Sequence, residues 1–203
     1  MQLSRVEILG KRWYRGPDGI LHPSAGTVLD ILYPDGMNFV REEDLARGSL
    51  CHEQVAKKLV AQVRDLTRTY QPCADPEVEM RVDRVVTHLE KYMRETVAIE
   101  SPTLFLGVGM TPDYVCKEVG PDGQWIRHVY DWKFVETIIE RYYYQAELYG
   151  RAEKADKFTL LQCNRKGEIF PLRVRPDPER WELIKSAINV RHHLAKKELK
   201  NHV

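Results

Sequence analysis

Apolar residues recur at helical spacing in two long segments of the chain. The first segment, from Glu42 to about Leu66, predicts a helix with apolar side chains at Leu45, Leu50, Val55, Leu59 and Val63. The second begins at about Pro76, a residue that suits the first turn of a helix, and continues through Val82, Val85, Val86, Leu89 and Met93. We expect two long helices in the first half of the chain.

Shorter elements precede these helices. Val6–Leu9 and Arg12–Arg15 are typical of strands, and the turn sequence of residues 16–19 follows them, so the N-terminus is expected to form a β-hairpin. Ser24 is a suitable cap for a short helix that runs to about Tyr33, where Pro34-Asp35-Gly36 would end it.

The apolar period changes to that of strands after residue 97. Residues 97–108 favour β structure, and two further strands, Asp113–Val119 and Trp125–Lys133, are joined by a turn at 120–123. A helix over 137–152, a strand pair at 158–163 and 168–174, and a helix over 177–200 complete the pattern. We expect one α/β domain over residues 1–203, in which helices flank a central mixed sheet.

Composition agrees with an ordinary globular domain. The chain has 203 residues, of which 43% are hydrophobic and 30% charged, and its longest apolar runs are shorter than a membrane span. The N-terminus lacks a signal-peptide core, so we expect a cytoplasmic protein that is not bound to a membrane. Its cysteines, at positions 51, 73, 116 and 163, form no Cys-x-x-Cys pair, so we expect reduced thiols and no iron–sulfur cluster.

The net charge of +1 gives no indication of nucleic-acid binding, but the end of the chain is locally basic. Between residues 185 and 200 the single acid, Glu198, stands against Lys185, Arg191, Lys196, Lys197 and Lys200. A solvated helix face and a phosphate-facing patch explain this equally well, and simple solubility is a third reading.

Asp113, Asp131 and Lys133 are the residues most suited to catalysis. Residues two apart on a strand face the same side, so Asp131 and Lys133 are expected to point into one pocket while Trp132 packs on the other face. The turn at 120–123 returns the chain so that Asp113 can complete a carboxylate pair. Surface strands often alternate charge, so Asp-x-Lys alone is weak evidence of a catalytic site. Its combination with Asp113 is stronger evidence.

In this order, Pro112-Asp113 and Asp131-Trp132-Lys133 resemble the PD-(D/E)XK nuclease superfamily. The similarity is greatest to its RecB-type exonuclease branch, which includes phage and mitochondrial single-strand exonucleases. Three further features match that branch: Arg47-Gly48 followed by His52, Gln145 followed by Tyr149, and an acid at Glu100. The opening hairpin and the segment from His22-Pro23-Ser24 to Leu29 are also similar to those of the small exonucleases of this branch. The resemblance therefore runs from about residue 12 to the end.

The resemblance implies a restriction-endonuclease-like core and a metal-dependent DNA nuclease, with exonuclease action on single strands or ends favoured. His52, Asp113, Asp131 and the Trp132 backbone carbonyl would bind Mg²⁺ or Mn²⁺, and Lys133 would position the attacking water. Glu100 would bind a second metal ion or orient a metal-bound water. The implied DNA-binding residues are Arg47, Arg141, Tyr142, Gln145 and Tyr149.

Each of these residues also has a structural interpretation. His52 can be a core histidine, Glu100 a solvated charge at a strand edge, and Gln145 with Tyr149 an ordinary amphipathic face. Two other functions therefore remain open: a non-catalytic nucleic-acid-binding module on the same fold, and a metal-dependent hydrolase of another substrate. Under the nuclease interpretation, DNA in a bacterial or phage-infected cell is the substrate, and replication or recombination proteins are candidate partners.

Overall fold

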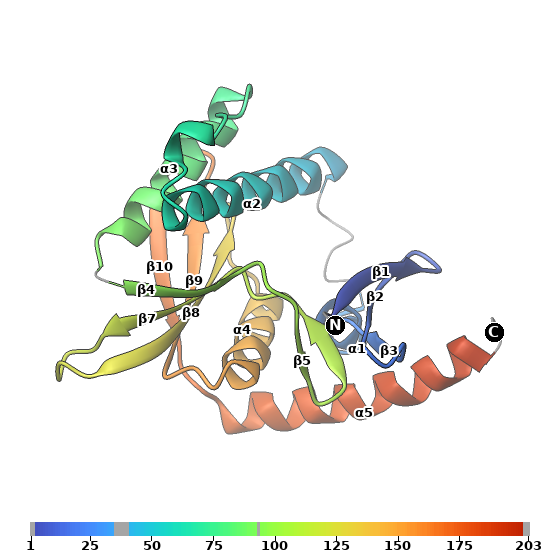
Figure 1. The fold of residues 1–203 in the computed structure, drawn as a ribbon. Coiled ribbons are helices and arrows are strands. Elements are labelled where there is room, and N and C mark those ends of the chain that lie inside the picture. Colours follow the sequence, from blue (N-terminus) through green and yellow to red (C-terminus); the bar gives the residue numbers. More distant parts are fainter. Residues whose placement is uncertain (1–2, 35–40, 93, 201–203) are drawn as a thin grey trace.

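A five-stranded mixed sheet forms the centre of the molecule (Figure 1). The computed structural model describes residues 3–34, 41–92 and 94–200. The strands of the sheet, in spatial order, are β10 (Ile169–Val174), β9 (Lys157–Cys163), β8 (Trp125–Lys133), β7 (Tyr114–Val119) and β4 (Arg94–Ile99).

Strands β8 and β9 are parallel, and the other neighbouring strands are antiparallel. A parallel pair needs a long connection, and here α4 (Glu140–Ala152) provides it. The turn between β7 and β8 lies at residues 120–123, as predicted, with Gly123 at φ +78°. This turn fixes the register in which Tyr114 pairs with Tyr130.

Helices α2 (Glu42–Val63) and α3 (Pro76–Glu90) pack on one face of the sheet (Figure 1). The buried face of α2 is made by Cys51, Val55 and Leu59, which are spaced by four residues. Leu45 and Val63, which the periodicity assigned to this face, are 41% and 57% exposed. The periodicity therefore identified the helix but placed the two ends of its apolar stripe wrongly.

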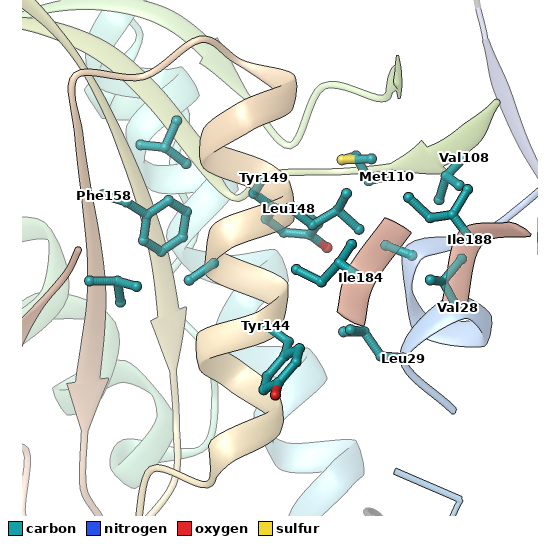
Figure 2. Packing of buried hydrophobic residues seen from close by; sticks show 14 of the residues in the cluster. Val28, Leu29, Val108, Met110, Tyr144, Leu148, Tyr149, Phe158, Ile184 and Ile188 are labelled. Atoms are coloured by element: carbon teal, nitrogen blue, oxygen red, sulfur yellow. The ribbon is translucent and has the colours of Figure 1, made fainter. Parts of the chain in front are cut away.

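A second apolar cluster fills the opposite face of the sheet (Figure 2). Leu148 of α4 points toward Ile184 of α5 (Pro178–Lys200), and Val28 of α1 (Ala25–Leu32) and Met110 of β6 (Val108–Met110) complete the packing. Strand β5 (Thr103–Phe105) pairs with β6. Ser24 caps α1 through a bond from the Thr27 backbone N–H, as its sequence predicts.

The N-terminal segment forms a small sheet of β1 (Ser4–Ile8), β2 (Lys11–Arg15) and β3 (Leu21–Pro23). Helix α5 holds it in place, because the Arg191 guanidinium lies 5.0 Å from the Trp13 ring centroid and Glu198 pairs with Lys11 at 2.6 Å. Trp13 and its neighbour Tyr14 are buried, so they are core residues rather than platforms for stacked bases.

The predicted fold class is confirmed, with local differences. The apolar run at 97–108 is three strands rather than one, because the chain turns at Glu100 and Leu106, both of which have positive φ. Helix α4 begins at Glu140, three residues later than predicted. The predicted helix stop at Asp35-Gly36 and the predicted helical residue Met93 lie outside the described residues. No helix among the described residues has the length and apolar character that crossing a bilayer requires.

Candidate active site

The register of the central sheet brings three carboxylates together at one end of it. Ile99 pairs with Tyr114 across β4 and β7, and Tyr114 pairs with Tyr130 across β7 and β8. Glu100, Asp113 and Asp131 each lie one residue beyond these paired positions. They are therefore neighbours across three adjacent strands. Asp113 lies just before β7, where its Oδ2 accepts a hydrogen bond of 2.8 Å from the Trp132 backbone N–H.

His52 reaches this row of acids from the middle of α2. Its Nδ1 lies 3.3 Å from Asp113 Oδ1 and 3.8 Å from Glu100 Oε1. One ligand atom from each of these three residues lies within 4.8 Å of the others. Burial lowers the pKa of His52, but the Asp113 and Glu100 carboxylates outweigh it and raise the pKa to about 9. The negative potential that raises this pKa also attracts a cation.

Glu100 has a left-handed backbone, with φ +45°, although it is not a glycine. Its backbone N–H donates to the Asp113 carbonyl over 2.9 Å, which fixes the chain at the point where β4 ends. A non-glycine residue in this region is strained by about 1–3 kcal/mol, and such residues concentrate at functional sites. The turn directs the Glu100 carboxylate toward His52 rather than along the sheet edge.

Asp131 and Lys133 form a buried pair beside the cluster. Lys133 Nζ lies 2.5 Å from Asp131 Oδ2, while Asp131 Oδ1 has no hydrogen-bond partner within the described part of the chain. Burial raises the pKa of Asp131 to about 6, against the effect of Lys133. For Lys133 itself, burial lowers the pKa, but Asp131 and Asp113 outweigh it, so the ammonium stays charged.

These residues fit a divalent metal ion. Buried carboxylate oxygens normally have hydrogen-bond partners, so the unpartnered Oδ1 of Asp131 indicates that something else binds there. One imidazole nitrogen together with carboxylate oxygens is a ligand set that accepts Mg²⁺ and suits Mn²⁺. His52, Glu100 and Asp113 form the compact ligand group. The Trp132 carbonyl stays a prediction, while its side chain is buried against α2 and α3, as expected.

Helix α4 covers the site with polar side chains. Gln145 Nε2 donates to Tyr149 Oη over 2.9 Å, and Tyr142 lies beneath Lys133, whose Nζ is 5.0 Å from the ring centroid. The next two residues of the helix are also tyrosines: Tyr144 is buried in the core, and Tyr143 packs against that core. Arg141 donates to the Gly26 carbonyl and pairs with Asp30, but its Nη1 is buried without a partner in the described chain.

Two hollows meet at this site. The first, of about 1200 Å³, contains the whole cluster with Gln145 and Tyr149. The second, of about 930 Å³, contains Arg47, Arg141 and Tyr142. Both are lined by Arg12, Ser49, His52, Lys133 and Gln145, so the cleft passes through the site.

Sequence reasoning missed the cationic residues of the first hollow, Arg5, Arg12, Lys57 and Arg64. These residues lie on the N-terminal hairpin and toward the end of α2, and no periodic pattern in the sequence indicates that both segments line one hollow. The basic C-terminal stretch, by contrast, lines neither hollow. Arg191 is buried against Trp13, and Lys185 pairs with Glu182 on α5 itself. The stretch is a helix face and an anchor for the hairpin, not a wall of this cleft.

No protein-family model and no curated protein matches the chain. Its fold is similar to that of a solved exonuclease. The structure of LHK-Exo in complex with dAMP has a TM-score of 0.51 and 10% identity, over 89% of this chain and 90% of that chain. A second structure, of an alkaline exonuclease (LHK-Exo) from Laribacter hongkongensis, has a TM-score of 0.48 and 11% identity, over 73% of this chain and 81% of that chain.

Proposed function

We propose that this protein is a metal-dependent nuclease of the PD-(D/E)XK type that hydrolyses phosphodiester bonds in DNA. One observation carries the proposal: a compact group of His52, Glu100 and Asp113 lies beside the buried Asp131–Lys133 pair in an open cleft. A structural ion cluster would have no reason to leave the buried Asp131 Oδ1 unpartnered at the wall of a cleft. The similarity in fold to an exonuclease agrees with the proposal.

His52, Asp113 and Asp131, with the Trp132 carbonyl, would hold Mg²⁺ or Mn²⁺, and Glu100 would join them or orient a bound water. When bound, the ion lowers the pKa of water and offsets negative charge on the phosphate. The residues of the chain would then hold the DNA strand in position and supply a fixed positive charge.

Lys133 would contribute the fixed positive charge. Its pKa is raised, so the ammonium is protonated at neutral pH and does not serve as a base. It would contact the attacking water and a phosphate oxygen, both of which gain negative charge during the reaction. The Tyr142 ring beneath the ammonium and the Asp131 carboxylate beside it limit where the side chain can point.

The remaining polar residues of the cleft would bind the DNA strand. Gln145 and Tyr149 are hydrogen-bonded to each other and face the cluster, so each is preoriented for a phosphate oxygen. Arg47, Arg141 and Tyr142 would contact the strand in the second hollow. We propose exonuclease action on single strands or DNA ends, as in the RecB-type branch, within bacterial or phage DNA processing and alongside replication or recombination proteins.

End-labelled single- and double-stranded DNA, incubated with Mg²⁺, Mn²⁺ or EDTA, tests the proposal. We expect metal-dependent hydrolysis by the wild type and none by Asp113→Asn, because that change weakens the metal site while keeping the hydrogen bond from Trp132. Glu95→Gln, an exposed acid on β4 outside the cleft, is the matched control and should cleave normally. DNA that is retarded but intact would identify a binding module, and an unbound, uncut DNA would point to another substrate.

A further inference from the structure

The first hollow extends well beyond the catalytic cluster. The N-terminal hairpin and the second half of α2 lie on opposite sides of the site (Figure 1). The hollow reaches Arg5 and Arg12 on the hairpin side, and on the other side it follows α2 to η1 (Thr67–Thr69) and the loop after it. We call these two extensions together the arm and define it by Arg5, Arg12, Lys57, Val60, Arg64 and Leu66.

The arm is positively charged although the catalytic end is negative. Four cationic residues, Arg5, Arg12, Lys57 and Arg64, line it, and the only acid on its α2 wall is Glu53. Glu53 is occupied by an ion pair of 2.6 Å with Lys57. The three arginines form no ion pair with any residue in the described ranges. Their charge is therefore available to a polyanion that lies in the arm.

The arm also has an apolar wall. Val60, Leu66 and Pro72 line it, and Leu66 is 47% exposed despite its size. Exposed apolar surface beside unpaired arginines suits a ligand that has both phosphates and apolar faces. A single nucleic-acid strand offers both, whereas a duplex keeps its base faces stacked inside.

The position of the arm relates it to the reaction. The two hollows share His52, Lys133 and Gln145, so a strand that crosses the cluster continues into both of them. Within the first hollow, the arm is the part of the cleft that extends beyond the cluster. A phosphate held at the cluster thus places its neighbours within reach of the hairpin and α2.

We propose that the arm binds a single strand on both sides of the scissile phosphate. Arg5 and Arg12 contact phosphates on the hairpin side, Arg64 contacts a phosphate on the α2 side, and the bases on that side lie against Val60 and Leu66. This inference rests on the proposed nuclease function, because it assigns the path of that enzyme's substrate. It follows that affinity and catalytic efficiency increase with strand length until the arm is filled.

Binding in EDTA isolates the arm from catalysis. We compare the wild type with Arg5→Ala/Arg12→Ala/Arg64→Ala by fluorescence anisotropy, using labelled dT20 at several salt concentrations. Each lost phosphate contact on a single strand lowers the slope of log K against log salt by about 0.7, so the triple variant should lose about 2. Arg68→Ala, on η1 but outside both hollows, is the matched control and should keep the full slope.

A second probe tests the apolar wall. An abasic 20-mer with the same phosphates should bind the wild type at least threefold more weakly than dT20, and a blunt 20-base-pair duplex should also bind more weakly than dT20. Equal affinities for dT20 and the abasic strand would overturn the base contacts. A triple variant with an unchanged salt slope would overturn the whole assignment, provided that its circular dichroism matches the wild type.

Hydrolysis separates this inference from the proposed function. With Mg²⁺ or Mn²⁺, the ratio of kcat/KM for dT20 to kcat/KM for a dithymidine phosphodiester should fall at least tenfold in the triple variant. An unchanged ratio in an active enzyme contradicts the arm alone. A wild type that binds dT20 with the expected slope but cleaves neither substrate contradicts the nuclease and leaves the arm assignment supported.

Discussion

Strands β7 and β8 bury two clusters of charged side chains, one at each end of the pair. The proposed catalytic cluster takes Asp113, Asp131 and Lys133 from these strands, and the distal cluster contains Glu118 and His128 together with Lys157 of β9. Both contain a buried carboxylate beside a lysine. They differ in how completely that carboxylate is satisfied.

In the distal cluster every oxygen of Glu118 has a partner. Lys157 Nζ and His128 Nδ1 both lie 2.9 Å from Oε1, and Tyr130 donates to Oε2 over 3.2 Å. Burial raises the pKa of Glu118, but these neighbours outweigh it and lower the pKa to about 2. Burial lowers the pKa of His128, so the ring is neutral at pH 7 and contributes as a hydrogen-bond partner rather than as a charge.

In the proposed catalytic cluster, burial outweighs the neighbouring charges in its effect on the carboxylate pKa. Burial raises the pKa of Asp131 to about 6, its Oδ2 is paired with Lys133, and its Oδ1 has no hydrogen-bond partner within the described structure. Carboxylates that crowd together without donors destabilise a fold, whereas carboxylates surrounded by donors stabilise it. The same strand pair thus has one end where the buried carboxylate is fully partnered and one end where a buried carboxylate oxygen has no partner in the described structure.

The largest expected difference between the two ends is in the response to losing a lysine. Lys133→Ala should reduce kcat at least about a hundredfold, the usual effect of losing a charge that stabilises the transition state. Lys157→Ala should leave kcat near that of the wild type, while unfolding costs about 1–2 kcal/mol less free energy. Cleavage of labelled single-stranded DNA and urea denaturation measure the two effects.

The two lysine variants are controls for each other, because both remove an ammonium from a carboxylate on the same strands. Normal turnover by Lys133→Ala would contradict the assignment of this lysine to the reaction. If Lys157→Ala lost turnover without losing stability, the division between the two ends would itself be wrong.

The next effect concerns the stability supplied by Glu118. Glu118→Gln should lower the free energy of unfolding by about 3 kcal/mol at pH 7, because the buried carboxylate that pairs with Lys157 and His128 becomes a neutral amide. Urea denaturation followed by circular dichroism measures the change. Glu95→Gln, whose side chain is exposed and pairs with Lys117 at 3.6 Å, should change stability by under about 0.5 kcal/mol. A loss no larger than this control would show that the distal cluster is not stabilising.

Asp131→Asn should destabilise the fold less than Glu118→Gln does. The neutral amide avoids the cost of a buried carboxylate but leaves the Lys133 ammonium without its charged partner, so the free energy of unfolding should fall by under about 1 kcal/mol. DNA cleavage should be lost. Thermal unfolding in EDTA gives the stability change without any contribution from bound metal. A loss of stability as large as that of Glu118→Gln would mean that Asp131 stabilises the fold as much as Glu118 does.

The two ends were not equally predictable from the sequence. Asp113, Asp131 and Lys133 form a local pattern of two strands and a turn, and the alternation of side chains along a strand is enough to put Asp131 and Lys133 on one face. The long helices and the turn at 120–123 are also local and were predicted correctly. Glu100 joins the site through a strained turn at the end of β4, which its own sequence does not indicate.

Long-range contacts account for what could not be predicted. The distal cluster joins three strands through the parallel pairing of β8 and β9, whose register depends on how α4 packs. The arm joins a hairpin to the far end of α2, and the hairpin is placed by Arg191 and Glu198 from the last helix. No short window of sequence contains both sides of either contact.

The last expected effect is a difference in acid sensitivity. Because the pKa of folded Glu118 is about 2 and its ordinary value is 4.5, folding releases a proton between these pH values. Its contribution to stability is therefore complete above about pH 4.5 and is lost as the pH falls toward 2. The wild type should lose its advantage over Glu118→Gln across this window, so the two unfolding free energies converge on acidification. Parallel urea titrations from pH 6 to pH 2.5 measure the difference, and a constant gap would show that the ion cluster stabilises the fold through packing alone.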